Sequence, residues 1–165
     1  MHNALEWQGK RLLDFSAASL ALLLLSPLLV IISFVIVLTM GSPVLFKHQR
    51  PGRNGKLFWL LKFRSMTSLA RGAEIDFDED AIRLTRFGKF LRKTSLDELP
   101  SLINVLRGDM SLVGPRPLLV EYLPLYSPSQ ARRHNLRPGL TGLAQIKGRT
   151  SLSWEQRFSY DAWYV

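Results

Sequence analysis

The longest apolar run in the chain lies near its N-terminus. No charged residue occurs from Phe15 to Phe46, and the centre of the run reads LALLLLSPLLVIISFVIVLTM. A run of this length is typical of a membrane helix. A cleaved signal peptide would have an apolar core of only about 7–15 residues followed by a small-residue cleavage site, so the run is too long for that alternative.

The dipeptide Ser26-Pro27 interrupts the apolar run near its middle. A single helix through the whole run would be about 48 Å long, whereas the apolar core of a bilayer is about 30 Å thick. Proline bends or breaks a helix, and the arms Phe15–Ser26 and Leu28–Met40 would each be only about 20 Å long, so a re-entrant hairpin could form. The physical argument alone favours the alternative, a Pro-kinked helix that spans the membrane.

Basic residues follow the apolar run directly, namely Lys47, Arg50, Arg53 and Lys56. Both membrane arrangements therefore place the next domain on the cytoplasmic face, because positive charges flanking a membrane segment stay inside. We predict a membrane segment over 1–46 and a cytoplasmic-face domain over 47–165.

Alternating positions then predict a β-hairpin in PVLFKHQRPGRNGKLFWLLKFRSM. The turn dipeptides Pro51-Gly52 and Asn54-Gly55 separate the two strands. In the second strand the alternation puts Lys62 and Arg64 on one face, opposite the aromatic and aliphatic side chains. Two adjacent cations on a strand could bind a phosphate, or they could simply be solvated.

The next segment begins with an acidic stretch, Glu74–Asp80, which lacks the glycine and terminal glutamate of a calcium loop and is predicted to be a solvated loop. The segment AIRLTRFGKFLRKTS then predicts a basic amphipathic helix, interrupted or bent near Gly88. Such a helix could lie on an anionic membrane surface or pack on the core with its basic face in water, and the pattern leaves both open.

A second helix is predicted from Ser95, which with Glu98 has the spacing of a capping box, to a terminating glycine, Gly108. Pro100 lies late for a helix that starts at Ser95, so a distorted first turn or a later start is the alternative. Its apolar stripe consists of Leu99, Leu102, Ile103 and Leu106.

Two adjacent acids, Asp97 and Glu98, would lie in the first turn of this helix. The helix N-terminus and the neighbouring cations Arg92 and Lys93 both favour ionised carboxylates. An ionised aspartate can attack phosphorus or bind Mg²⁺ through oxygen. Solvated helix-capping acids are the simpler alternative.

The C-terminal part contains further candidate anion-binding residues. Arg116 is bracketed by prolines, so it would lose little entropy on binding a phosphate. The segment LRPGLTGLAQIKGRTS is glycine-rich and basic, with a short strand expected over Thr141–Ile146 and helical segments expected before it, around Leu118–Leu125 and Ser129–Asn135. Asp161 is an isolated acid among aromatic residues, which could be functional or a local cap.

Composition narrows the possible partners. The 165 residues suffice for one compact domain, and the net charge of +9 lies entirely after the apolar run. A basic domain expects nucleic acid, anionic lipid or a phosphorylated substrate. No cysteine is present, and neither a P-loop nor a nucleic-acid-binding motif occurs. A membrane-tethered basic binding protein for anionic lipid or nucleic acid is therefore the alternative to an enzyme.

Three blocks together resemble a known family. KFRSM, TSLDELPSLINVLRGDMSLVGPRPLL and RPGLTGLAQIKGR are similar to the signature blocks of the bacterial sugar transferases, the monotopic phosphoglycosyl transferases. Ser26-Pro27 within the apolar segment also matches, so the resemblance covers nearly the whole chain. The phrase GPRPLLVEYLPLYS resembles the small members that begin bacterial N-linked glycan assembly.

The resemblance implies an α/β (α+β) catalytic domain with surface amphipathic helices and a re-entrant, Ser-Pro-broken membrane helix, in place of the spanning helix. It implies transfer of a sugar 1-phosphate from a UDP-sugar to undecaprenyl phosphate, with release of UMP and with Mg²⁺ as cofactor. The expected location is the cytoplasmic face of the bacterial inner membrane, in contact with anionic lipid and without nucleic acid. The identity of the sugar is not indicated.

The resemblance also implies roles for single residues. Asp97 would be the nucleophile, Glu98 would assist with the metal or a proton, both would bind Mg²⁺, and Lys62 would be an essential lysine. The other implied site residues are Arg92, Arg116, Arg149 and Asp161. The basic pattern adds Arg64 and Arg137 as predicted substrate-binding residues. Family members usually continue beyond the position of Val165, so a weakened relative that acts as a scaffold is a third alternative.

Overall fold

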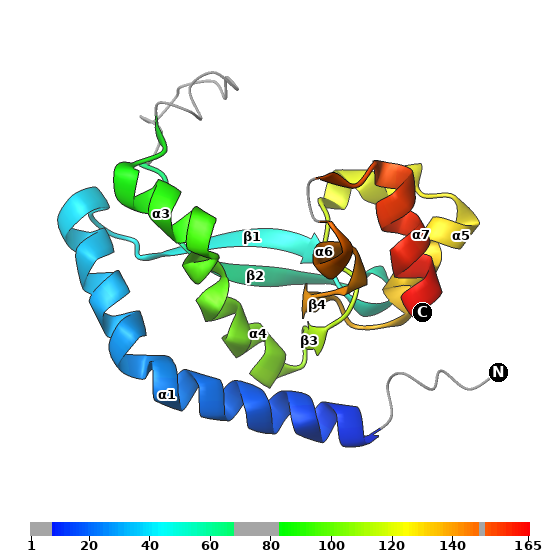
Figure 1. Cartoon of the computed structure of the whole chain (residues 1–165), viewed down its shortest axis with the longest axis horizontal. Coiled ribbons are helices and arrows are strands. Elements are labelled where there is room, and N and C mark those ends of the chain that lie inside the picture. Colours follow the sequence, from blue (N-terminus) through cyan, green and yellow to red (C-terminus); the bar gives the residue numbers. More distant parts are fainter. Residues whose placement is uncertain (1–7, 68–82, 149–150) are drawn as a thin grey trace.

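The computed structural model describes residues 8–67, 83–148 and 151–165 (Figure 1). Helices and strands are mixed along the chain, as predicted. In chain order the elements are α1 (Gln8–Met40), β1 (Leu45–Pro51), η1 (Arg53–Gly55), β2 (Leu57–Phe63), α3 (Arg86–Thr94), η2 (Leu96–Ser101), α4 (Leu102–Arg107), β3 (Ser111–Val113), η3 (Val120–Leu125), α5 (Pro128–Ala131), η4 (Arg132–Asn135), β4 (Gly139–Thr141), α6 (Leu143–Lys147) and α7 (Trp154–Tyr164).

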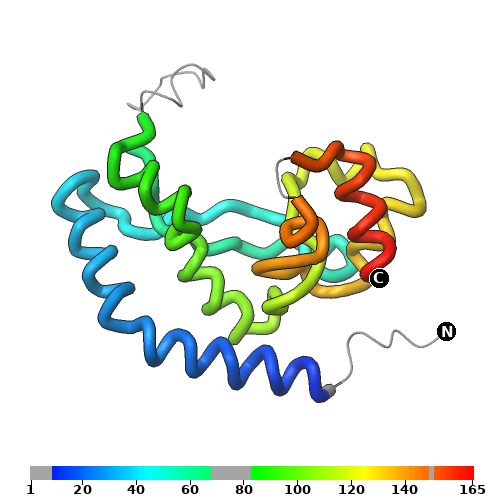
Figure 2. Tube along the Cα trace, in the orientation of Figure 1, coloured from blue at the N-terminus to red at the C-terminus, as the bar shows by residue number. Residues whose placement is uncertain are grey.

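The apolar run forms one long helix, α1, which changes direction in its middle (Figures 1 and 2). Pro27 lies inside this helix and has no N–H to donate to the carbonyl of Leu23, one turn earlier. The hydroxyl of Ser26 donates to that carbonyl instead, over 2.8 Å. The helix therefore bends without losing its continuity, and the re-entrant arrangement stays a prediction.

The two arms of α1 pack on two separate clusters of the core. Ala18, in the first arm, contacts a cluster that contains Leu60 and Val105. Ile32 and Ile36, in the second arm, belong to a cluster that also includes Phe63. α1 and the following domain thus share their core, and the predicted boundary at residue 46 stays a prediction.

Most other apolar side chains of α1 point away from the protein. Leu23, for example, is 71% exposed, and Leu24 is 69% exposed. In the described part of the chain, α1 is the one helix long and apolar enough to cross a membrane.

The predicted hairpin is confirmed. β1 and β2 pair antiparallel, with Phe46 opposite Lys62 and Arg50 opposite Phe58. The connection is tight because Asn54 and Gly55 adopt positive φ angles of 56° and 72°. Because directly opposite residues point to the same face, Arg50 at the end of β1 shares the face of Lys62.

The predicted basic helix is present as α3 only from Arg86, after a bridge between Leu84 and Met66, so the predicted segment is interrupted shortly before Gly88 and is not bent at Gly88 itself. α3 runs continuously through this position. A Cβ atom at Gly88 would lie 1.8 Å from the carbonyl oxygen of Ser65, so the glycine allows the helix to pack closely on the chain that leaves β2. Leu91 is fully buried, which shows that α3 packs on the core; attachment of its basic face to a membrane stays a prediction.

α3, η2 and α4 follow one another across the hairpin (Figure 1), and two buried polar side chains fasten η2 and α4 to β2. Asn104 accepts from the backbone N–H of Leu61 (3.0 Å) and donates to the carbonyl of Trp59 (2.8 Å). Ser101 donates to the carbonyl of Leu61 (2.7 Å). These bonds replace a strand partner, so they fix η2 relative to β2. Gly108, with φ of 88°, ends α4 as predicted.

The C-terminal elements gather at one end of the hairpin, where α6 and α7 lie beside the yellow segment that contains α5 (Figure 2). The expected helical segments before β4 are present as η3, α5 and η4. The expected strand over Thr141–Ile146 is wrong, because β4 ends at Thr141 and α6 follows. The sequence LAQIK consists largely of good helix formers, and β3 offers pairing only as far as Thr141.

Candidate active site

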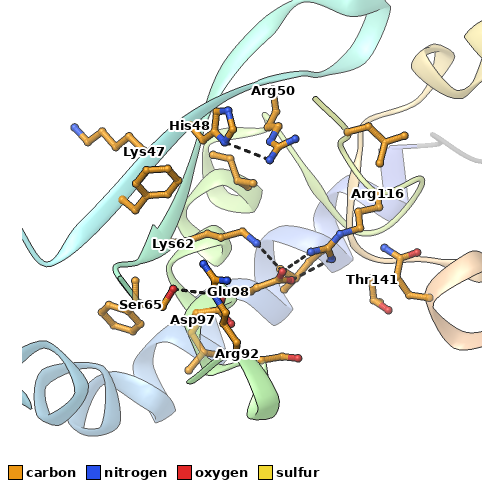
Figure 3. A pocket seen from close by; sticks show the side chains of 18 of the residues that line it. Lys47, His48, Arg50, Lys62, Ser65, Arg92, Asp97, Glu98, Arg116 and Thr141 are labelled. Carbon is orange, nitrogen blue, oxygen red and sulfur yellow. Dashed lines mark hydrogen bonds and ion pairs between the residues drawn. The ribbon is translucent and has the colours of Figure 1, made fainter. Parts of the chain in front are cut away.

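A cleft of about 1430 Å³ lies between the hairpin, η2 and the C-terminal elements. Figure 3 shows its polar centre. Seven of the predicted site residues line it: Lys62, Arg64, Arg92, Asp97, Glu98, Arg116 and Asp161. Arg137 lies elsewhere, and Arg149 falls outside the described residues.

The two acids are held on a 3-10 turn, and the predicted capping box is wrong. Ser95 has φ of 59° and ends α3 in the left-handed conformation, whereas an N-cap residue needs extended backbone. Its side chain accepts no capping hydrogen bond, and its carbonyl accepts from the N–H of Glu98 (3.2 Å). The carboxylate of Glu98 therefore makes no capping hydrogen bond to Ser95 and instead points at side chains across the cleft.

Glu98 holds two cations together. Lys62 Nζ donates to Glu98 Oε1 over 2.7 Å, and Arg116 Nη2 donates to the same oxygen over 2.5 Å (Figure 3). Burial raises the pKa of Glu98, but the hydrogen bonds and charges of Arg116 and Lys62 outweigh it and hold the pKa at about 2. Glu98 is thus ionised at neutral pH and fixes the positions of both cations.

Asp97 is in a different electrostatic state from its neighbour. It is only 9% exposed. Burial and the negative charge of Glu98 raise the pKa of Asp97, against the opposing charges of Lys62 and Arg92. The cations and a backbone hydrogen bond favour the ionised form of Asp97, as expected from the sequence, but burial opposes them and leaves the pKa above its ordinary value. A further positive charge beside Asp97 would favour its ionised form.

Arg92 approaches Asp97 from the last turn of α3. Its Nε donates to the hydroxyl of Ser65 over 2.9 Å, which anchors the side chain at the edge of the cleft (Figure 3). The positive charge of Arg92 acts on Asp97 and lowers its pKa. Arg92 and Lys62 thus place positive charge around the buried acid.

Arg64 and Arg137 are engaged at helix ends. Arg64 lines the cleft, yet its guanidinium donates to the carbonyl of Ser42 (3.1 Å) and to those of Met40 and Gly41 at the end of α1. Arg137 donates through Nε to the carbonyl of Gly108 (2.8 Å), at the end of α4. Cations are favourable at these positions because the carbonyls have no partners within the helix. A role in substrate binding stays a prediction for both.

Asp161 has a partner that the sequence analysis missed. Its Oδ2 lies 2.8 Å from Nη2 of Arg133, and the two side chains are 6% and 3% exposed. Burial raises the pKa of Asp161, and the charge of Arg133 opposes this. Arg133 Nη2 also donates to the carbonyl of Arg116 (2.6 Å). The signal in the sequence was an isolated acid among aromatic residues, which needs a cation if it is buried.

His48 and Arg50 on β1 also line the cleft and were not assigned to the site from the sequence. His48 Nδ1 and Arg50 Nη2 are 3.3 Å apart (Figure 3). Strand alternation could have found them, because the residue opposite Lys62 is Phe46, and every second residue after Phe46 shares its face.

The comparison with known proteins supplies the decisive observation. A family model described as bacterial sugar transferase matches residues 5–165. The chain belongs to the bacterial sugar transferase family. This is a family of phosphoglycosyl transferases, which confirms the resemblance seen in the signature blocks. The finer resemblance, to members that begin N-linked glycan assembly, stays a prediction.

Three relatives illustrate the relationship. The uncharacterized sugar transferase EpsL of Bacillus subtilis is 53% identical over 156 residues, which is 94% of this chain and 77% of EpsL. The undecaprenyl-phosphate galactose phosphotransferase of Salmonella typhimurium is 41% identical over 94% of this chain and 36% of its own length. The UDP-glucose:undecaprenyl-phosphate glucose-1-phosphate transferase of Klebsiella pneumoniae is 42% identical over 99% of this chain and 37% of its own length. This family member therefore spans about a third of the length of the latter two.

Proposed function

We propose that this protein transfers a sugar 1-phosphate from a UDP-sugar to undecaprenyl phosphate and releases UMP, as the first membrane step in the assembly of a bacterial glycoconjugate. The observation that carries the proposal is the Asp97-Glu98 pair, with Asp97 buried and Glu98 partly buried, surrounded by Lys62, Arg92 and Arg116 in one cleft. The names of the Salmonella and Klebsiella relatives describe sugar-phosphate transfer to undecaprenyl phosphate and support the same chemistry.

The reaction would proceed in two displacements at one phosphorus atom. In the first, a carboxylate oxygen of Asp97 bonds to the phosphorus next to the sugar, and the bond from that phosphorus to the bridging oxygen breaks. UMP leaves with the bridging oxygen and its electron pair. In the second, a phosphate oxygen of undecaprenyl phosphate bonds to the same phosphorus, and Asp97 departs as a carboxylate. The product is a sugar linked to undecaprenyl diphosphate.

The surrounding cations make such an attack electrostatically feasible. A carboxylate and a diphosphate repel each other unless positive charge lies between them. Lys62 and Arg116 are held at Glu98, and Arg92 is held at Ser65, so these charges need little reorganisation when substrate arrives. Positive charge also favours ionisation of Asp97, whose pKa is raised in the free protein. Glu98, already ionised, would position the cations.

Mg²⁺ is the proposed cofactor, held by Asp97 and Glu98. Among the residues that the structure describes, no group of three or more His, Cys, Asp or Glu side chains could hold a metal ion. The pair nevertheless fits Mg²⁺, because this ion is commonly bound through one or two carboxylates together with substrate phosphates and water. When bound, the ion supplies positive charge to the phosphate oxygens.

We propose that the enzyme works on the cytoplasmic face of the bacterial inner membrane, with α1 as a re-entrant helix. The exposed apolar side chains of α1, its bend and the Ser26 hydroxyl that satisfies the Leu23 carbonyl support this arrangement. The excess of basic residues after α1 would attract anionic lipid. A site at the level of the headgroups would receive a lipid-linked acceptor without extracting it from the bilayer. Nucleic acid is not an expected partner.

The test is release of UMP by purified protein in lipid or detergent, with undecaprenyl phosphate, Mg²⁺ and a panel of UDP-sugars. We expect UMP from at least one sugar, and none from Asp97→Asn or without Mg²⁺. Glu155→Gln is the matched control, because Glu155 is an exposed acid outside the cleft and should leave the rate unchanged. A folded wild-type protein that releases no UMP from any sugar would contradict the proposal and favour a scaffold or a binding protein.

A further inference from the structure

Arg50 occupies an unusual position on the wall of the cleft. It lies at the end of β1, half-buried, and faces the same space as Lys62 and Arg116 (Figure 3). Its Nε is shielded from solvent and has no hydrogen-bond partner within the described part of the chain. A shielded cationic donor without a partner is costly, so the position of Arg50 calls for a ligand that accepts a hydrogen bond.

The charges around Arg50 favour an anion. Arg116 lines the same cleft, and its positive charge lowers the pKa of Arg50, in addition to the larger effect of burial. The guanidinium of Arg116 is paired with the carboxylate of Glu98, and the same carboxylate is also paired with Lys62. The negative charge that acts on Arg50 comes from Glu121, an exposed residue of η3. The β1 side of the cleft thus carries more positive than negative charge.

His48 holds the guanidinium of Arg50 in place. A hydrogen bond from Nη2 of Arg50 requires His48 Nδ1 to be an unprotonated acceptor. Burial and the charge of Arg50 lower the pKa of His48, which favours the neutral imidazole that this hydrogen bond needs. One end of the guanidinium is thereby fixed, and the Nε donor remains for a ligand.

We propose that Arg50, positioned by His48, forms with Arg116 a subsite that binds substrate phosphate oxygens on the β1 side of the cleft. The inference rests on the proposed function, which supplies two phosphate-bearing substrates. The phosphate could belong to the diphosphate of the nucleotide sugar or to the polyprenyl phosphate. A planar guanidinium suits either, because it presents several donors in a fixed geometry to phosphate oxygens.

Equilibrium binding tests the subsite without turnover. UDP, UMP and undecaprenyl phosphate in mixed micelles are titrated into Asp97→Asn protein, alone and combined with Arg50→Gln or Arg50→Lys. We expect Arg50→Gln to weaken binding of at least one of these ligands by about ten- to a hundred-fold, the usual effect of losing a charge-assisted hydrogen bond. Arg50→Lys should recover only part of the affinity, because the ammonium lacks the planar fork.

Lys56→Gln is the matched control. Lys56 is an exposed cation in the same hairpin and does not line the cleft, so its removal changes the net charge equally. If Lys56→Gln and Arg50→Gln lose the same affinity, the loss comes from the change in net charge and not from a contact with Arg50, and the proposed subsite is contradicted. Circular dichroism and thermal unfolding of each variant show whether misfolding causes a loss of affinity. If Arg50→Gln misfolds, the affinity of Arg50→Lys for the same ligands tests the subsite instead.

Steady-state kinetics shows which of the two substrates supplies the phosphate that binds at the subsite. In a double displacement, kcat/KM for each substrate reports only its own half-reaction. A drop for the UDP-sugar alone assigns the subsite to the diphosphate, and a drop for undecaprenyl phosphate alone assigns it to the acceptor. Unchanged binding of all three ligands and unchanged kcat/KM for both substrates would overturn the proposal. Failure of the proposed function is recognised separately, since wild-type protein would then release no UMP while the binding titrations still report on Arg50.

Discussion

Arg133 Nη2 lies 2.8 Å from Asp161 Oδ2, in an ion pair whose side chains are almost completely buried. The same nitrogen donates to the carbonyl of Arg116, whose guanidinium binds Glu98. Arg133 also packs over the rings of Tyr126 and Phe158. An acid of the C-terminal helix α7 is therefore connected through two arginines to the acidic pair. From these contacts we infer that Asp161 helps to position Arg116; direct substrate binding by Asp161 stays a prediction.

We predict that Asp161→Asn destabilises the protein and lowers turnover. Removing one partner of a buried ion pair costs about 3–5 kcal/mol, because the other charge stays buried. The double variant Arg133→Met with Asp161→Leu should recover stability, since it leaves no unpaired charge, but not activity, since Arg116 loses its anchor. Thermal unfolding and UMP release measure the two effects. Recovery of both by the double variant would contradict the positioning role.

The acidic pair predicts a defined response to pH. Glu98 has a pKa of about 2 in the folded protein and an ordinary value of 4.5. Its stabilising effect is therefore complete above pH 4.5 and is lost as the pH falls toward 2. We expect about 2 kcal/mol, less than the full linkage value because Arg116 is partly exposed. Stability measured from pH 7 to pH 3 should fall more steeply for wild-type protein than for Glu98→Gln, and equal slopes would contradict the pairing.

The ionised carboxylate of Asp97 is expected to lower the stability of the folded protein, whereas that of Glu98 raises it. Its raised pKa means that the ionised form is disfavoured by folding, and this cost is present at neutral pH and disappears as the pH falls below the folded pKa. Asp97→Asn should therefore raise the unfolding temperature of the free protein at pH 7 while reducing turnover by about a thousand-fold or more. At a pH low enough to protonate Asp97, the two proteins should unfold at similar temperatures. A less stable Asp97→Asn at pH 7 would disprove the electrostatic assignment.

If α1 is re-entrant, both of its ends lie on the cytoplasmic side of the membrane, and cysteine labelling can test this prediction. The chain has no cysteine, so a single cysteine introduced at Gln8 and another at Lys56 can each be labelled alone. In intact spheroplasts, a re-entrant helix protects both positions from an impermeant maleimide, because both lie inside. Pro27→Ala should straighten the helix and expose the cysteine at position 8 in a fraction of molecules. Labelling of position 8 in the otherwise unchanged protein would identify a spanning helix instead.

The sequence alone determined the elements whose signals are local. The helix of the apolar run, the hairpin turn at Asn54-Gly55 and the end of α4 at Gly108 depend on neighbouring residues, and each is present in the structure, while the re-entrant break at Ser26-Pro27 stays a prediction. The Asp97-Glu98 pair was also found from the sequence, because its surrounding motif resembled a family.

Tertiary structure decided how those residues are used. Lys62 meets Glu98 from 36 residues away, and Arg133 was unassigned until α7 brought Asp161 to it. Arg64 turned to the end of α1, although strand alternation put it beside Lys62. The raised pKa of Asp97 follows from burial, which no local pattern reports. Turns and helix ends follow from short-range backbone preferences, whereas ion pairs and desolvation depend on which distant segments pack together, and only the folded chain specifies that.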